Sequence, residues 1–173
     1  MDQQKEDIRI YVACLAAYNN GRLHGVWIDA VKDIHDIWTE IRTMLRCSPE
    51  PDAEEHAIHD YEGFEGLRLS EYEGLESVCE KAAFIAEHGR LGAEVAAYFG
   101  GDIEEARKAL EHHYAGAYAS LAEFAEDITG DTTEVPDNLR FYIDYERMGN
   151  DLAINDVIAI ETGFQEVHIF WSH

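Results

Sequence analysis

The sequence is poor in basic residues. Lys and Arg together number 13 among 173 residues, whereas Asp and Glu number 36, which gives a formal net charge of -23. Solubility alone needs a net charge of only about 2 to 8 for a small domain, and stronger self-repulsion destabilises a compact fold. Nucleic acid, anionic membranes and polyphosphate would all be repelled, so direct binding to nucleic acid or to a membrane is excluded. A partner with a deep basic surface fits this charge.

Cysteine is also scarce, and long apolar runs are missing. Cys14, Cys47 and Cys79 are odd in number and lack C-x-x-C spacing, which is typical of a reduced cytosolic protein rather than a disulfide scaffold. No stretch approaches the roughly 18 apolar residues of a membrane helix, and residues 1–10 lack a cationic segment followed by an apolar one. We therefore expect a cytoplasmic protein without a membrane span.

Apolar residues, by contrast, are plentiful. They make up 46% of the chain and include three Trp, nine Tyr and seven Phe, which is too much for a disordered acidic tail. Residues 8–16 and 23–30 are rich in β-branched and aromatic residues, and the Asn-Gly turn signal at 19–21 predicts a hairpin between them. Residues 157–160 and 167–171 predict a second hairpin around Thr162 and Gly163.

Helical periodicity fills much of the chain between these hairpins. Apolar residues at 34, 37, 38, 41 and 45 share one helical face, and Asp33 is placed to cap that helix. Residues 56–61 predict a short strand. Apolar positions from 75 to 85 predict a second helix that Gly89 would close.

Further helix signals follow the Gly100-Gly101 pair, which marks a boundary. Capping boxes at 102–105 and 120–123 each predict a helix, and the second helix is expected to end at Gly130. Pro136 predicts another helix that continues to Ile143. Together these patterns predict an α+β fold with a sheet near each end and helices between.

Catalytic and metal-binding patterns are weak. The candidate metal ligands are the pairs His56 with His59 and His112 with His113. On a strand the first pair would point to opposite faces, and on a helix the second pair would diverge by about 100°. The chain also lacks a phosphate-binding glycine loop, a nucleophile elbow and EF-hand spacing. We predict no metal, no cofactor and no catalytic residue.

The distribution of acidic residues is more informative. Residues 1–49 hold seven acids and six bases, whereas residues 50–166 hold 29 acids and seven bases. An ordinary solvated face intersperses Lys and Arg, yet residues 50–87 set twelve acids against only Arg68 and Lys81. Duplex DNA carries one charge per roughly 1.7 Å of axis, so 23 negative charges correspond to about 40 Å of duplex. Carboxylates in place of phosphates could therefore occupy a basic groove without offering a strand to cut.

From Ile8 to Phe170 the sequence resembles the ArdA antirestriction family. The matching pieces follow one another in the order expected for the family. They are IRIYVACLAAYNNGRLHGVWID at 8–29, EEHAIHDYEGF at 54–64, YAGAYAS at 114–120, YIDYERMGNDLAI at 142–154 and VHIF at 167–170.

The resemblance implies an elongated chain of three small domains: an N-terminal α/β domain at 1–61, a central helical domain at 62–101 and a C-terminal α/β domain at 102–173. It also implies a homodimer that imitates bent B-form DNA. Family members bind type I restriction-modification enzymes and displace DNA from them, have no catalytic site, and are typically carried by plasmids, transposons or phages.

The implied functional surface is collective, and we call its predicted members the acidic set. Seven members lie in the matched pieces: Glu54, Glu55, Asp60, Glu62, Asp144, Glu146 and Asp151. Charge and predicted exposure add Glu65, Glu71, Glu73, Glu76, Glu80, Glu87, Asp102, Glu104, Glu105, Glu111, Glu123, Glu126 and Asp127. Two alternatives stay open: an acidic adaptor or inhibitor of another basic DNA-binding protein, and a metal-dependent hydrolase that uses His56 or His113.

Overall fold

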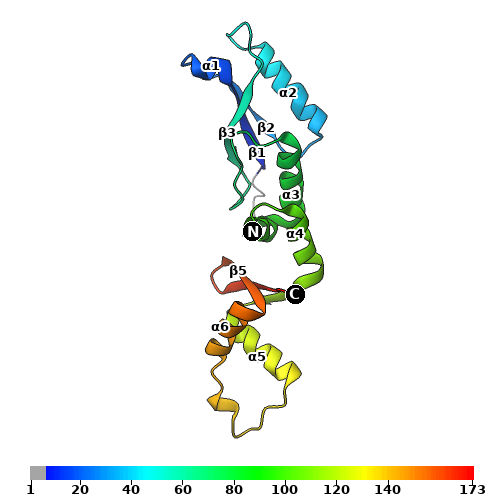
Figure 1. Ribbon diagram of the computed structural model, residues 1–173, viewed down its shortest axis with the longest axis vertical. Coiled ribbons are helices and arrows are strands. Elements are labelled where there is room, and N and C mark those ends of the chain that lie inside the picture. The colour runs from blue at the N-terminus through cyan, green and yellow to red at the C-terminus, as the bar shows by residue number, and fades with distance from the viewer. Residues whose placement is uncertain (1–6) are drawn as a thin grey trace. The chain divides into compact units, whose positions relative to one another are not determined.

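The computed structural model describes residues 7–173 of the chain (Figure 1). These residues divide into two compact units, of which the first ends at Ile103 and the second comprises Glu104–His173. Of the described residues, 47% are helical and 22% are in strands, and each unit contains one small antiparallel sheet within them. This confirms the predicted α+β class with a sheet near each end. The division of the chain into three domains stays a prediction.

The first unit is built on a sheet whose strand order is β2-β1-β3. Its strands are β1 (Arg9–Cys14), β2 (Gly25–Asp29) and β3 (His56–Glu62), and both pairings are antiparallel. Because side chains alternate along a strand, one face carries Ile10, Val12 and Ile28, which are fully buried. Strand β3 confirms the strand predicted at 56–61. The antiparallel register of β1 and β2 confirms the predicted pairing of the first two strands.

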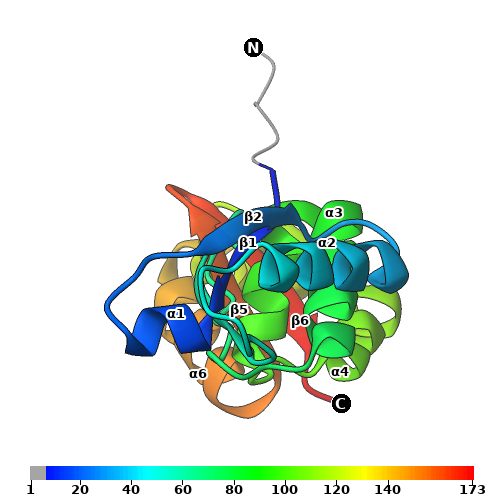
Figure 2. The ribbon, with the colours of Figure 1, turned by 90° about the horizontal axis from the view of Figure 1, so that it is seen from above.

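Helix α2 (Ile34–Arg46) packs against β1 and β2 and covers that apolar face (Figure 2). Its buried residues are Ile37, Ile41 and Met44, which recur at helical spacing. Asp33 caps the helix as predicted, because its carboxylate accepts a hydrogen bond from the backbone N–H of His35 at 2.8 Å.

The connection between β1 and β2 differs from the predicted tight turn. The first strand ends at Cys14, and a short helix, α1 (Leu15–Asn19), follows it directly. Ala17 on this helix is fully buried, so the helical turn packs an apolar side chain into the core. Gly21, at φ 77°, then turns the chain back toward β2.

Helix α3 (Leu75–Tyr98) is interrupted at Gly89, where φ is 65° and ψ is -152°. Non-glycine residues rarely adopt this conformation, so Gly89 ends the first helical segment as predicted, but a second segment begins immediately after it. The first segment buries Leu75, Val78 and Ala82 on one side. Two short elements then continue the chain: α4 (Ile103–Lys108) and a π-helical turn, η1 (Ala109–His113).

The sheet of the second unit has the strand order β4-β6-β5. Its strands are β4 (Tyr114–Tyr118), β5 (Val157–Gly163) and β6 (Glu166–Trp171). The predicted hairpin of β5 and β6 is confirmed, although its turn lies at Phe164 and Gln165 rather than around Thr162 and Gly163. Strand β4 was not predicted, because two Ala and one Gly give its sequence YAGAY little strand propensity.

Two helices pack together in this unit: α5 (Leu121–Thr132) and α6 (Tyr145–Asn155). Phe124 of α5 joins Val157, Val167 and Ile169 of the sheet in the core. The hydroxyl of Ser120 caps α5 by accepting a hydrogen bond from the Glu123 N–H at 3.1 Å, as the capping box predicts. The helix runs two residues beyond the predicted end at Gly130.

The predicted helix between Pro136 and Ile143 is wrong. Only a 3₁₀ turn, η2 (Arg140–Tyr142), forms there, and α6 begins later, after Asp144. Phe141 and Tyr142 are 93% and 84% exposed, so an apolar helix face at this position would have nothing to pack against among residues 7–173.

None of the helices in residues 7–173 combines the length and the apolar character that a membrane crossing requires.

The contact between α5 and α6 depends on Gly149, which is buried at their crossing. A Cβ at this position would lie 2.7 Å from the carbonyl oxygen of Leu121, whereas a Cβ at Gly130 on α5 would meet nothing within 4 Å. We therefore expect Gly149→Ala to lower the free energy of unfolding by about 1–2 kcal/mol despite the better helix propensity of Ala. The control Gly130→Ala should raise it by up to about 1 kcal/mol. Urea unfolding measures both, and equal stability of Gly149→Ala and the wild type would contradict this packing.

Candidate functional surface

Carboxylates dominate the exposed polar surface of both units. Nineteen of the twenty members of the acidic set are exposed, ten in the first unit and nine in the second. The structure thus places the predicted side chains in solvent on both units. The exposed members are Glu54, Glu55, Asp60, Glu62, Glu65, Glu71, Glu76, Glu80, Glu87, Asp102, Glu104, Glu105, Glu111, Glu123, Glu126, Asp127, Asp144, Glu146 and Asp151.

Helix α3 carries the most regular row of these carboxylates. Glu76, Glu80 and Glu87 share the exposed side of its first segment, with the exposed Ala83 between the second and the third. At about 1.5 Å of rise per residue the row is about 16 Å long, so its three charges lie on average about 8 Å apart. One DNA strand carries a charge every 3.4 Å or so, so the charges on this helix are more widely spaced than those of a DNA strand.

Helix α5 presents a second group near its N-terminus. Glu123, Glu126 and Asp127 are exposed, whereas Phe124 and Ala125 between them are buried. Acidic residues in the first turn are favoured by the partial positive charge of a helix N-terminus. The hydroxyl of Tyr118 donates a hydrogen bond to Asp127 at 3.0 Å. The pKa of Tyr118 is raised above its usual value, mainly because the hydroxyl is partly buried and secondly because of this hydrogen bond.

Few of these carboxylates lie close to a cation. Glu62 pairs with Arg9, and Glu105 lies 3.8 Å from Lys108. Glu71, Glu87 and Glu111 lie 3.4, 3.8 and 3.9 Å from His59, His88 and His112, which are cations only when protonated. Such exposed pairs are worth at most about 1 kcal/mol. Within residues 7–173, no Lys, Arg or His nitrogen lies within 4.0 Å of the carboxylates of Glu54, Glu55, Glu65, Glu76, Glu80, Glu104, Glu126 and Glu146. The negative charge of the surface is therefore largely uncompensated.

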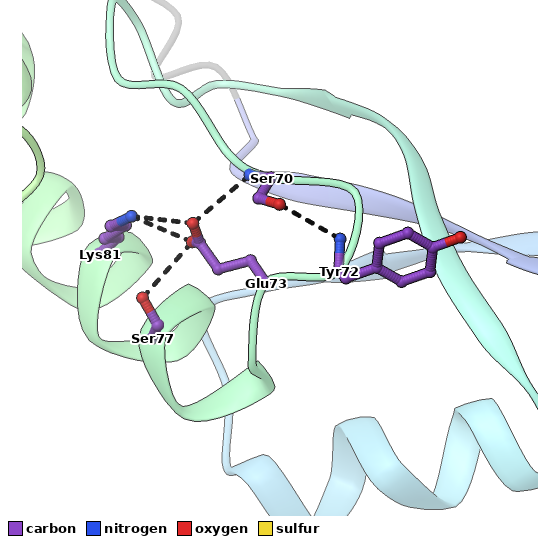
Figure 3. Close-up of polar contacts among 5 residues, drawn as sticks. All are labelled: Ser70, Tyr72, Glu73, Ser77 and Lys81. Carbon is purple, nitrogen blue, oxygen red and sulfur yellow. Dashed lines mark hydrogen bonds and ion pairs between the residues drawn. The ribbon is translucent and has the colours of Figure 1, made fainter.

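Glu73 is the exception in the acidic set (Figure 3). Its side chain is only 14% exposed, and both of its oxygens accept hydrogen bonds from Nζ of the buried Lys81, at 3.0 and 3.1 Å. The Ser77 hydroxyl and the Ser70 N–H each donate to the same carboxylate at 3.4 Å. Glu73 thus ties the loop before α3 to that helix and adds nothing to the exposed charge.

The candidate metal ligands are kept apart. The ring of His56 packs on Trp38 of α2 with centroids 5.5 Å apart, whereas the ring of His59 packs on Tyr18 of α1 at 4.6 Å. Burial lowers the pKa of His56. Within the described residues, no group of three or more His, Cys, Asp or Glu side chains is arranged to hold a metal ion.

A sequence model of the ArdA family, described as antirestriction proteins, matches residues 10–166. This match spans nearly the whole chain. The chain belongs to the ArdA antirestriction family. Among curated proteins, none matches it. ArdA proteins are inhibitors rather than enzymes, and antirestriction implies an interaction with restriction enzymes in general.

The ArdA segment at 142–154 has a partly structural role. Asp144 caps α6, because its carboxylate accepts a hydrogen bond from the Arg147 N–H at 3.0 Å, and Gly149 permits the contact with α5. Asp144, Asp151 and Asp156 line one hollow of about 340 Å³ on this helix. The segment thus carries exposed carboxylates together with residues that the fold itself requires, namely Asp144 and Gly149.

Further exposed carboxylates lie outside the acidic set. They were not predicted to belong to it, because only their charge marks them and none of the segments similar to the ArdA family contains them. They include Asp52, Asp131, Glu134, Asp137, Asp156 and Glu161.

The pairing of Glu73 with Lys81 predicts a large effect on stability from a single neutralisation. Glu73→Gln leaves the buried Lys81 ammonium without its counter-ion, and we expect it to lower the free energy of unfolding by about 3 kcal/mol. The matched control is Glu71→Gln on the same loop, which removes an exposed charge and should change stability by less than about 1 kcal/mol. Urea unfolding compares the two, and equal effects would show that the pair is not a buried one in solution.

Proposed function

We propose that this ArdA protein is a dimeric DNA mimic that occupies the DNA-binding groove of a type I restriction-modification enzyme. The observation that carries the proposal is the exposed, largely uncompensated charge: nineteen carboxylates of the acidic set face solvent on both units. A basic groove attracts such a surface as it attracts phosphates. The mimic contains no phosphodiester bond, so the enzyme cannot cleave it.

The amount of charge is on the scale of a DNA footprint. At one charge per roughly 1.7 Å of duplex axis, the net charge of -23 corresponds to about 40 Å of DNA, and a dimer would supply about twice that. Folded elements hold these charges, so a mimic loses less conformational freedom on binding than a flexible acidic tail would. Occupying the DNA-binding groove is then enough to inhibit the restriction enzyme.

The proposed dimer is supported by apolar side chains on the second unit. Phe141, Ile154 and Phe164 are 93%, 79% and 92% exposed. Large exposed apolar side chains are common where a protein contacts another chain. Sedimentation equilibrium tests this: a dimer has twice the chain mass of 19.6 kDa, and a chain that stays monomeric at micromolar concentration would contradict it.

The place of action that fits this function is the cytoplasm, where restriction enzymes meet incoming DNA. We expect the gene to lie on a mobile genetic element, which benefits when restriction is blocked. The alternative is an acidic adaptor for another basic DNA-binding protein. Charge alone supports both, whereas the family match favours the restriction enzyme.

The proposal predicts that the purified protein displaces labelled specific DNA from a type I restriction enzyme at near-stoichiometric concentration. Because exposed charges each contribute at most about 1 kcal/mol, Glu80→Gln should weaken displacement by less than about fivefold. The triple change Glu76→Gln, Glu80→Gln and Glu87→Gln should weaken it by about tenfold or more. The control Ala83→Gln places the same amide on the same helix face without removing charge, and should leave displacement unchanged.

Two outcomes would contradict the proposal. Failure of the folded, dimeric protein to displace DNA would exclude the type I enzyme as its target and favour the acidic adaptor. Abolition of displacement by Glu80→Gln alone would show that one carboxylate dominates, contrary to a distributed mimic.

A further inference from the structure

The first sheet has a second face, opposite α2, that stays open to solvent. We call it the open face, and its members follow from the strand register: Arg9 lies opposite Asp29 and Glu62, and Tyr11 lies opposite Trp27 and Asp60. All six are exposed or half-buried, whereas Ile10, Val12 and Ile28 on the other face are fully buried.

Two aromatic rings lie together on the open face. The rings of Tyr11 and Trp27 have centroids 5.4 Å apart, and Trp27 is 37% exposed. Gly25 makes room for this arrangement, because a Cβ there would lie 2.7 Å from the Tyr11 ring. The two ring planes are inclined by 50°, so the sheet offers an aromatic surface of two tilted rings within a strongly acidic unit.

Arg9 shows which group this surface accepts. Its guanidinium lies 4.8 Å from the centroid of the Trp27 ring, and its Nε pairs with Glu62. A ring on one side and a carboxylate at the edge match the planar guanidinium, which stacks and donates several hydrogen bonds at once. Asp29 and Asp60 are exposed on the same face, so its three carboxylates outnumber its single guanidinium.

We propose that the open face binds an arginine side chain of the basic partner, which stacks on the Tyr11–Trp27 surface and pairs with Asp60. That the partner is a restriction enzyme rests on the proposed function; the preference for arginine rests on the geometry of this face. Aromatic residues often dominate binding energy at protein interfaces, whereas exposed carboxylates are each worth little. The open face thus supplies an anchor within a diffuse electrostatic attraction.

The first test needs no restriction enzyme. The ¹⁵N-labelled protein has three Trp indole N–H signals, and Trp27→Leu assigns the one from Trp27. Titration with octa-arginine should move this signal further and at lower peptide concentration than titration with octa-lysine. Trp171 is equally exposed, at 37%, but packs on Phe124, and its signal serves as the internal control for non-specific peptide binding. Equal responses of Trp27 to the two peptides, or none, would overturn the proposal.

The second test measures displacement of DNA from the restriction enzyme. Trp27→Leu keeps an apolar side chain on the strand but removes the ring, and should weaken displacement about five- to tenfold. Trp27→Tyr keeps a ring and should stay within about twofold of the wild type. Equal potency of Trp27→Leu and the wild type, or conversion of a dimer into a monomer by Trp27→Leu, would overturn the arginine site. If the wild type fails to displace DNA while the peptide preference holds, only the proposed function is wrong.

Discussion

Repulsion among carboxylates is the constraint that the rest of this structure has to withstand. With 36 acidic and 13 basic residues, charge pairing cannot hold the chain together, so cohesion comes from apolar cores in which almost no charge is enclosed. In the first unit α2 covers the apolar face of the sheet, and in the second Phe124 packs into the β5–β6 hairpin. Lys81, which is 9% exposed, is matched by Glu73 at hydrogen-bonding distance, because an unpaired buried ammonium would be costly. Buried Lys81 is paired, whereas the charge outside the cores is largely uncompensated.

This separation explains how an inhibitor can work without a catalytic site. Long-range attraction to a basic groove needs many exposed charges, and no single one of them has to be placed accurately. Short-range recognition needs groups with a defined shape, and the Tyr11–Trp27 surface is such a group. In the proposed complex the two would be complementary: the carboxylates would attract the basic partner, and the aromatic surface would fix a contact that bulk charge cannot specify. The helix-capping roles of Asp33, Ser120 and Asp144 hold the acidic elements in place for both.

The sequence predicts an element of this fold where its buried residues recur at a regular spacing. The helix at α2 and the β5–β6 hairpin follow from apolar periodicity, because their buried residues recur at helical or strand spacing. Prediction fails where tertiary contacts override local preference. Strand β4 has a weak strand sequence but pairs with β6, whereas the residues after Pro136 have a helical pattern but stay exposed, with no surface in the described part of the chain to pack against. Within the acidic set, exposure follows from charge alone except at Glu73, whose position depends on a lysine eight residues away on a helix. The open face could not be predicted from composition, because its members depend on which residues of neighbouring strands lie opposite one another.

The measurement that tests the mimicry most directly is the salt dependence of binding between this ArdA protein and a type I restriction enzyme, set beside that of the enzyme for its DNA. If exposed carboxylates take the place of phosphates, both affinities fall steeply as salt is raised from about 50 to about 200 mM, by at least about tenfold for the protein. An affinity of the protein that stays constant over this range while that of DNA falls would show that the complex is held by contacts other than imitated phosphates, and would contradict the account.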